Sequence, residues 1–189
     1  MFTRVLLLLA LLLLPQTTAR ADDAPWELLK EPGAIVLFRH AHAPGVGDPS
    51  GFSLDDCSTQ RNLDSRGRQE AVAIGAEFAR RGIAVGLVLS SQWCRARDTA
   101  ELAFPGRALK EPAFNSFFGN RQDEAAATVA ALDVLGRWDG PGAMVVVSHQ
   151  VNISALTGET PRPGEGIIIR IDRGKAIVLG RLPPPKLSD

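Results

Sequence analysis

Three short, unbroken apolar runs constrain this sequence more than any other feature. They occupy residues 34–38, 84–89 and 143–147. Runs of this length without polar alternation are typical of strands that are buried on both faces. Segments with helical spacing separate and follow them, at residues 65–81, 93–103 and 122–137. The alternation of buried strands with helices predicts a mainly parallel sheet that is covered on both faces.

The C-terminal part of the chain has the pattern of a hairpin. Two strand-like segments, residues 166–171 and 175–180, flank a turn at Asp172-Arg173-Gly174. We therefore expect an α/β fold, a three-layer α/β/α sandwich whose mainly parallel sheet ends in an antiparallel C-terminal edge hairpin. Residues 105–121 contain two prolines and no clear periodicity, so we expect an irregular segment there.

The first 21 residues have the pattern of a secretory signal peptide. Arg4 precedes ten unbroken apolar residues, and Ala19-Arg20-Ala21 is a small-x-small cleavage site. Ten residues span about 15 Å as a helix, which is about half of the hydrocarbon core of a bilayer. We expect cleavage after Ala21, a mature domain at residues 22–189, a periplasmic or secreted location, and no stable membrane anchor after cleavage.

Charge and cysteine content exclude several classes of protein. The 21 Lys and Arg balance the 21 Asp and Glu, so the chain has no basic field for binding nucleic acid. Two cysteines, Cys57 and Cys94, are too few for a disulfide scaffold or a four-sulfur zinc site. After export they are predicted to form one bridge, and two free thiols are the alternative.

Polar clusters follow all three buried runs. The clusters are Arg39-His40, residues 90–95 and Ser148-His149. Carboxyl ends of parallel strands meet at one edge of a sheet, so the clusters should converge on one crevice. The guanidiniums of Arg39 and Arg95 fit phosphate oxygens, and a helix that opens after Ser91 would direct free N–H groups to the same place. The sequence therefore predicts a pocket for a phosphoryl group.

At these positions the chain resembles the histidine phosphatase superfamily, the phosphoglycerate mutase-like proteins. Four elements match in the family's order: Arg39-His40-Ala41, residues 63–71, residues 90–100 and Ser148-His149. Residues 40–45 and 148–158 are most similar to an exported bacterial branch that resembles lipopolysaccharide core heptose phosphatases. The resemblance implies a phosphoric monoester hydrolase.

The resemblance also implies a role for each site residue. His40 would be the nucleophile that forms a phosphohistidine, while His149, Arg39 and Arg95 would offset charge on the phosphoryl oxygens. Apart from the resemblance, Arg61 lies in the loop before the helix expected at residues 65–81, where it either adds a phosphate contact or is a solvent-exposed loop residue. Neither a metal nor another cofactor is expected, because guanidiniums take the role that Mg²⁺ has elsewhere. The expected partner is a small phosphorylated molecule, and an envelope phosphosugar is one candidate.

Two residues depart from the family's pattern. Ala41 replaces the usual glycine, which is acceptable where the backbone does not need a positive φ. Asn115, four residues before Gly119, occupies the position where many members carry the acid that protonates the leaving group. The proton donor is therefore Asp123, Glu124 or none of the residues in this stretch; without a donor, substrates with good leaving groups are favoured.

Two other functions compete with the phosphatase hypothesis. The pocket of a binding module would hold a phosphorylated ligand without turnover, and Asn115 favours that reading. His40, His42 and His149 would alternatively form a three-histidine zinc site, although the adjacent arginines would repel a divalent cation. His42 otherwise positions phosphate or lines the loop. The sequence predicts neither the organic half of the substrate nor the oligomeric state.

Overall fold

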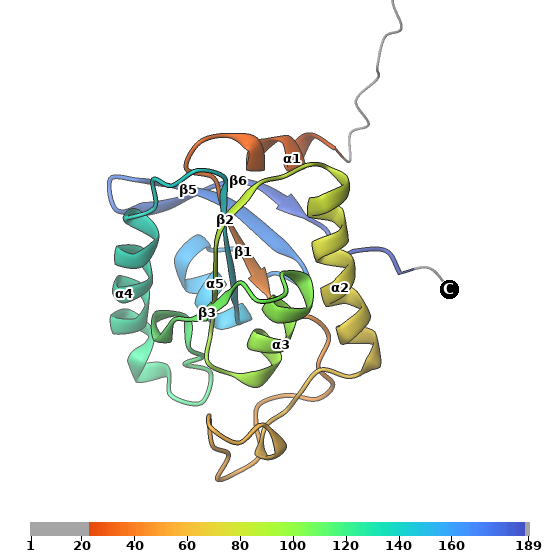
Figure 1. Ribbon diagram of the computed structural model, residues 1–189. Coiled ribbons are helices and arrows are strands. Elements are labelled where there is room, and N and C mark those ends of the chain that lie inside the picture. Colours follow the sequence, from red (N-terminus) through yellow and green to blue (C-terminus); the bar gives the residue numbers. More distant parts are fainter. Residues whose placement is uncertain (1–22, 188–189) are drawn as a thin grey trace, which may run out of the picture.

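The computed structural model describes residues 23–187 and places a six-stranded sheet between layers of helices (Figure 1). The strand order is β3-β2-β4-β1-β5-β6. The strands are β1 (Ile35–Arg39), β2 (Val85–Ser90), β3 (Ala108–Lys110), β4 (Ala143–Ser148), β5 (Gly166–Asp172) and β6 (Lys175–Leu182). Strands β1 to β4 are parallel, whereas β5 pairs antiparallel with both β1 and β6. The expected α/β sandwich with an antiparallel C-terminal hairpin is confirmed; the expected signal peptide lies outside the described residues.

Side chains of each buried strand enter two separate cores. In β1, Val36 and Phe38 pack with α1 (Ala24–Glu27), α2 (Ser65–Arg80) and α3 (Cys94–Ala103). Ile35 and Leu37 face the other way, toward α4 (Glu124–Gly136) and α5 (Gln150–Thr157). Both faces of the central strands are therefore covered, which explains why their sequences are apolar without alternation.

Helix α2 has clear start signals and one unusually close contact. Asp64 caps it by accepting a hydrogen bond from the Gly67 N–H at 2.8 Å. A Cβ atom at Gly67 would lie 2.0 Å from the carbonyl oxygen of His42. Only glycine lets the first turn of α2 approach the loop after β1 this closely.

The segment expected to be irregular contains short regular elements. It holds β3 and the 3₁₀ turn Pro112–Phe114, and a second 3₁₀ turn, Arg121–Asp123, begins at its last residue. Strand β3 escapes prediction because it has only three residues and lies at an exposed sheet edge. Across residues 23–187, the helices are too short or too polar to cross a membrane.

A disulfide fastens the long loop after β1 to the sheet's functional edge. Cys57 and Cys94 are bonded, with their Cα atoms 5.7 Å apart, so the predicted bridge is confirmed. Cys94 is the first residue of α3 and directly precedes Arg95. The loop lies beyond the carboxyl end of β1 (Figure 1), where a ligand of a parallel sheet is expected.

Candidate active site

Three consecutive backbone N–H groups after β1 are each held by a different element. The bonds are His40 N to Ser148 O at 2.9 Å, Ala41 N to Thr99 Oγ1 at 3.0 Å, and His42 N to Glu70 Oε2 at 2.9 Å. The acceptors belong to β4, α3 and α2. The main chain that carries His40 is therefore fixed from three sides.

The His40 ring is buried and its tautomer follows from its partner. Nδ1 lies 2.8 Å from the carbonyl oxygen of Ala41. A carbonyl only accepts, so Nδ1 carries the proton and Nε2 keeps its lone pair. Burial, and then the charge of Arg95, hold the pKa of His40 well below its usual value. His40 is therefore neutral at pH 7, as a nitrogen nucleophile has to be.

His149 lies beside His40 at the end of the neighbouring strand. The two ring centroids are 5.5 Å apart, and the rings meet edge to face. His149 Nε2 lies 2.8 Å from Ser91 Oγ, and Ser91 Oγ donates to Asn115 Oδ1 at 3.3 Å or to the imidazole. Burial is the main cause that lowers the pKa of His149 well below normal. The topology thus brings together two neutral imidazoles from positions far apart in the chain.

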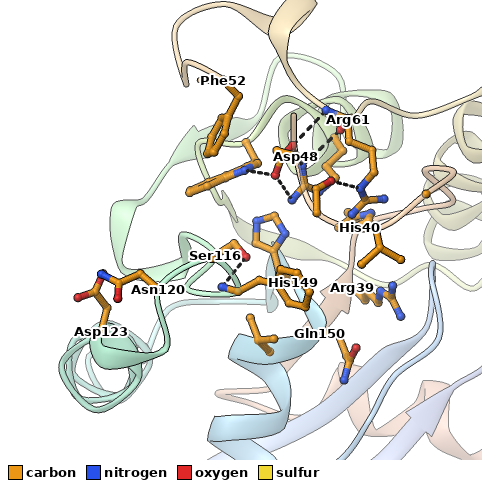
Figure 2. A pocket seen from close by; sticks show the side chains of 18 residues that line it. Arg39, His40, Asp48, Phe52, Arg61, Ser116, Asn120, Asp123, His149 and Gln150 are labelled. Atoms are coloured by element: carbon orange, nitrogen blue, oxygen red, sulfur yellow. Dashed lines mark hydrogen bonds and ion pairs between the residues drawn. The ribbon is translucent and has the colours of Figure 1, made fainter. Parts of the chain in front are cut away.

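Three arginines line the same cavity as these rings, which has a volume of about 640 Å³; two of them, Arg39 and Arg61, are labelled in Figure 2. Arg39, Arg61 and Arg95 all line it. Of the buried polar atoms in residues 23–187, Nε of Arg39 and Nε of Arg95 are among those with no hydrogen-bond partner in the protein. Burial and the nearby Arg95 lower the pKa of Arg61 to about 10, and Arg61 is still charged at pH 7. Unpaired donors and concentrated positive charge fit a tetrahedral dianion.

Arg61 is a half-buried cavity residue, so the reading of it as a solvent-exposed loop arginine does not hold. Its Nε and Nη1 donate to the carbonyls of Gly47 and Ala43 at 2.8 and 2.6 Å. These bonds fold the loop back on itself. Its guanidinium thereby stands next to that of Arg95, which supports a direct phosphate contact.

Asp48 is the main cavity residue that the sequence did not reveal. Its carboxylate accepts from Nη1 and Nη2 of Arg95 at 2.7 and 3.1 Å, from Trp93 Nε1 at 3.0 Å and from Arg61 N at 3.0 Å. The hydrogen bonds from Arg95 and Arg61 lower the pKa of Asp48 against the opposing effect of its burial. A charged Asp48 therefore fixes Arg95 and holds the loop against α3. The only sequence signal was an acid within the loop already expected to be functional.

The helix expected to aim its N–H groups at the phosphate does not do so. At the start of α3, the N–H groups of Gln92, Trp93 and Cys94 are taken by side chains of Asn115, Ser91 and Gln60. The helix whose first turn meets the cavity is α5. It begins directly after His149, and its first two residues line the cavity. Its positive end favours an anion there.

The structure does not support the proposed three-histidine metal site, and it shows how Ala41 is accommodated. His42 is not a cavity residue; its Nδ1 lies 3.0 Å from Asp64 Oδ2, so the three histidines do not converge. In the part of the chain that the structure describes, no three His, Cys, Asp or Glu side chains form a cluster suited to a metal ion. Ala41 is accommodated without a positive φ: within residues 23–187, Arg173 alone among non-glycine residues has one.

The three positions considered for a proton donor also differ. The side-chain oxygen of Asn115 accepts hydrogen bonds from Gln92 N and Ser91 Oγ, and Asn115 does not line the cavity. Glu124 pairs with Arg121 at 2.6 Å and does not line the cavity either. Asp123 lines it, but at the end beside Asn120, away from His40 and Arg39 (Figure 2). None of the three lies at the nucleophile.

Fold and cavity together define a class: three-layer α/β/α proteins with paired imidazoles and several guanidiniums at the carboxyl edge of the sheet. No protein-family model matches the chain, and no curated protein matches it. Solved structures do share the fold. The protein histidine phosphatase SixA, complexed with tungstate, is 19% identical with a TM-score of 0.56, over 80% of this chain and 97% of that one.

Two further structures show the same relationship. Rv3214 from Mycobacterium tuberculosis is 13% identical with a TM-score of 0.57, over 80% of this chain and 97% of that one. A mutant phosphoserine phosphatase from Entamoeba histolytica, in complex with phosphoserine, is 11% identical with a TM-score of 0.52, over 78% of this chain and 95% of that one. At these identities the comparisons establish a common fold.

Proposed function

We propose that this protein is an exported phosphatase that hydrolyses a phosphomonoester through a phosphohistidine on His40. One observation carries the proposal: a neutral imidazole with a free Nε2 lines a cavity that also holds three guanidiniums. The phosphatases that share the fold support it, since one of them binds tungstate, a tetrahedral oxyanion.

The residues suggest two in-line displacements. The Nε2 lone pair of His40 attacks phosphorus, the bond from phosphorus to the bridging oxygen breaks, and the leaving oxygen takes the electron pair. Water then attacks the phosphohistidine, the N–P bond breaks, and inorganic phosphate leaves. Arg39, Arg95 and Arg61 offset the charge on the equatorial oxygens in both steps, and His149 contacts the same group.

The carboxylates of the cavity favour substrates with good leaving groups. Asp48 is held ionised by Arg95, and Asp123 lies at the far end of the cavity. A leaving oxygen therefore departs without a side-chain proton donor beside His40, so stable leaving anions are hydrolysed faster. We propose a small phosphorylated molecule as substrate; an envelope phosphosugar is one candidate, but the poor leaving group of a sugar hydroxyl counts against it.

The proposed location is periplasmic or secreted. The signal-like residues 1–21 motivate it, and the disulfide between Cys57 and Cys94 supports it, because such bonds persist in oxidising compartments. Immunodetection of the protein in fractionated cells tests this: a processed form is expected outside the cytoplasm, and an unprocessed cytoplasmic form would contradict export.

The experiment for the proposed chemistry is phosphoryl trapping. With ³²P-labelled phenyl phosphate at neutral pH, the wild type is expected to form an acid-labile, alkali-stable phosphoprotein. His40→Asn should lose the label and at least 1,000-fold in kcat, on the order of the loss when a nucleophile is removed. The matched control is His42→Asn, which changes the histidine two residues away that is not in the cavity.

The outcomes separate the competing functions. Retained turnover in His40→Asn would exclude His40 as the nucleophile. Binding of inorganic phosphate by wild type without turnover or label would instead make the protein a phospholigand-binding module. Stoichiometric zinc on which activity depends, in chelator-washed protein, would favour a metal-dependent hydrolase.

A further inference from the structure

A row of aromatic rings leads from the proposed nucleophile to the mouth of the cavity. Ring centroids are 5.5 Å apart from His40 to His149, 5.5 Å from His149 to Trp93, and 5.6 Å from Trp93 to Phe52. All four residues line the cavity. We call these four residues the aromatic wall.

The two outer residues of the aromatic wall, Trp93 and Phe52, are also held in place. The Trp93 indole N–H donates to Asp48 Oδ2, and Asp48 is itself fixed by Arg95. Phe52 belongs to the loop that the disulfide fastens to α3. A ligand would therefore meet a preformed surface of ring edges and faces, and little conformational entropy would be lost on binding.

Apolar side chains also lie at the mouth of the cavity. Phe118 is 51% exposed and Val46 is 86% exposed, although both line the cavity. Phe118 reaches toward the loop, since a Cβ atom at Gly47 would lie 3.8 Å from its ring. The cavity thus has charged side chains at its inner end and apolar side chains at its mouth.

Polar groups near the mouth are partly engaged with each other. Asn120 Nδ2 donates to Asp123 Oδ2 at 3.0 Å, and Ser116 Oγ accepts from Phe118 N at 3.3 Å. Such pairs offer fewer free partners to a substrate rich in hydroxyls. A flat apolar group suits this part of the cavity better than a polyol.

We propose, on the basis of the phosphatase function proposed above, that the substrate carries its phosphoryl group on an aromatic ring, which packs between the aromatic wall and Phe118. The bond from phosphorus to the bridging atom breaks when His40 attacks. The electron pair stays on that atom and delocalises into the ring, and solvent later supplies the proton. An aromatic leaving group therefore does not need a carboxylic acid beside His40 to protonate it as it departs.

Inhibition constants of phosphonates test the proposal without requiring turnover. Phenylphosphonate, cyclohexylphosphonate, methylphosphonate and inorganic phosphate should be compared at a pH at which all are dianions. Phenylphosphonate is expected to bind at least 10-fold more tightly than methylphosphonate, with cyclohexylphosphonate between them. Phe52→Ala should reduce that preference about fivefold, as expected for one lost aromatic contact, and should leave the phosphate constant within twofold.

Phe118→Ala gives an independent check if Phe52→Ala fails to fold, because Phe118 is half exposed. Val129→Ala is the matched control: Val129 is 68% exposed on α4 and is not a cavity residue. Equal binding of phenyl- and methylphosphonate would overturn the proposal, as would tighter binding of a pyranose phosphate than of phenylphosphonate. If phosphonates bind selectively but no phosphate ester is hydrolysed, the phosphatase function fails while the ring preference stands.

Discussion

Asp48 sets how much of the Arg95 guanidinium remains for a ligand. Arginine has five N–H donors, and three of those on Arg95 go to Asp48 and to the Arg61 carbonyl. The Nε–H and one Nη2–H remain. Asp48 also offsets one of the three positive charges in the cavity. The residue thus fixes both the direction and the strength of the proposed phosphate contact.

Replacing Asp48 tests this role at the level of stability. Asp48→Asn leaves Arg95 buried without its anion and is expected to lower the free energy of unfolding by about 3 kcal/mol. Asp98→Asn is the control; its pair with Arg68, at 3.2 Å, is partly exposed to solvent, so its cost should stay below about 1 kcal/mol. Urea denaturation measures both. Inorganic phosphate should stabilise Asp48→Asn more than wild type, and equal stabilisation would contradict the proposed competition for Arg95.

The two buried imidazoles make stability depend on pH. Both have pKa values below the usual 6.5 in the folded protein, so the unfolded chain binds more protons between those values and pH 6.5. The free energy of unfolding therefore rises with pH across this window. The stability that the two neutral imidazoles contribute is lost as pH falls below about 6.5. Urea denaturation at pH 5 and pH 7 checks the sign. His149→Gln should flatten the dependence, and an unchanged slope would exclude His149 as a source.

Helices α2 and α3 support the segment directly after β1, which carries His40. Glu70 of α2 and Thr99 of α3 accept the N–H groups of His42 and Ala41, so these two residues of the matching segments hold the backbone. Trp93 and Arg95 are the residues of those segments that line the cavity. Sequence motifs around an active site thus include residues that never touch a substrate.

Gly67 offers a sharp test of that support. In Gly67→Ala the new methyl would lie 2.0 Å from His42 O, so α2 has to move away from the loop. We expect the free energy of unfolding to fall by about 3 kcal/mol and kcat to fall at least 10-fold, because His40 shifts with the loop. Gly136→Ala is the matched control near the end of α4, where the nearest side-chain atom is 3.9 Å away. Similar losses in both variants would refute a specific role for the contact.

At the scale of the whole molecule, the disulfide joins the loop that carries Asp48 and Phe52 to the helix that carries Arg95. The bond closes a span of 37 residues. The variant Cys57→Ser/Cys94→Ser is expected to lose about 4 kcal/mol of unfolding free energy on the chain-entropy model. Reduced wild type should behave in the same way. Equal urea midpoints for oxidised and reduced protein would show that the loop is held by its other bonds alone.

The sequence predicted the central sheet because β1, β2 and β4 are buried on both faces. It predicted Arg39, His40, Arg61, Arg95 and His149 as a group, and the structure brings all five to one cavity. It missed Asp48, and it missed Phe52 and Trp93 of the aromatic wall. Their positions depend on how a glycine-rich loop closes over α3, and periodicity carries no information about such closure. It also missed the side chains of Asn115 and Gln60, which occupy the helix N–H groups expected to bind phosphate.

Cys94 and Arg95 are neighbours in the chain, and this adjacency sets a time order for maturation. A newly made copy with reduced thiols lacks this bond, so the contacts of Asp48 with Trp93 and Arg95 have to hold the loop to α3 without it. We expect such a copy to hold phosphate weakly. If the protein is exported as proposed, full hydrolytic capacity is expected only after the polypeptide meets an oxidant.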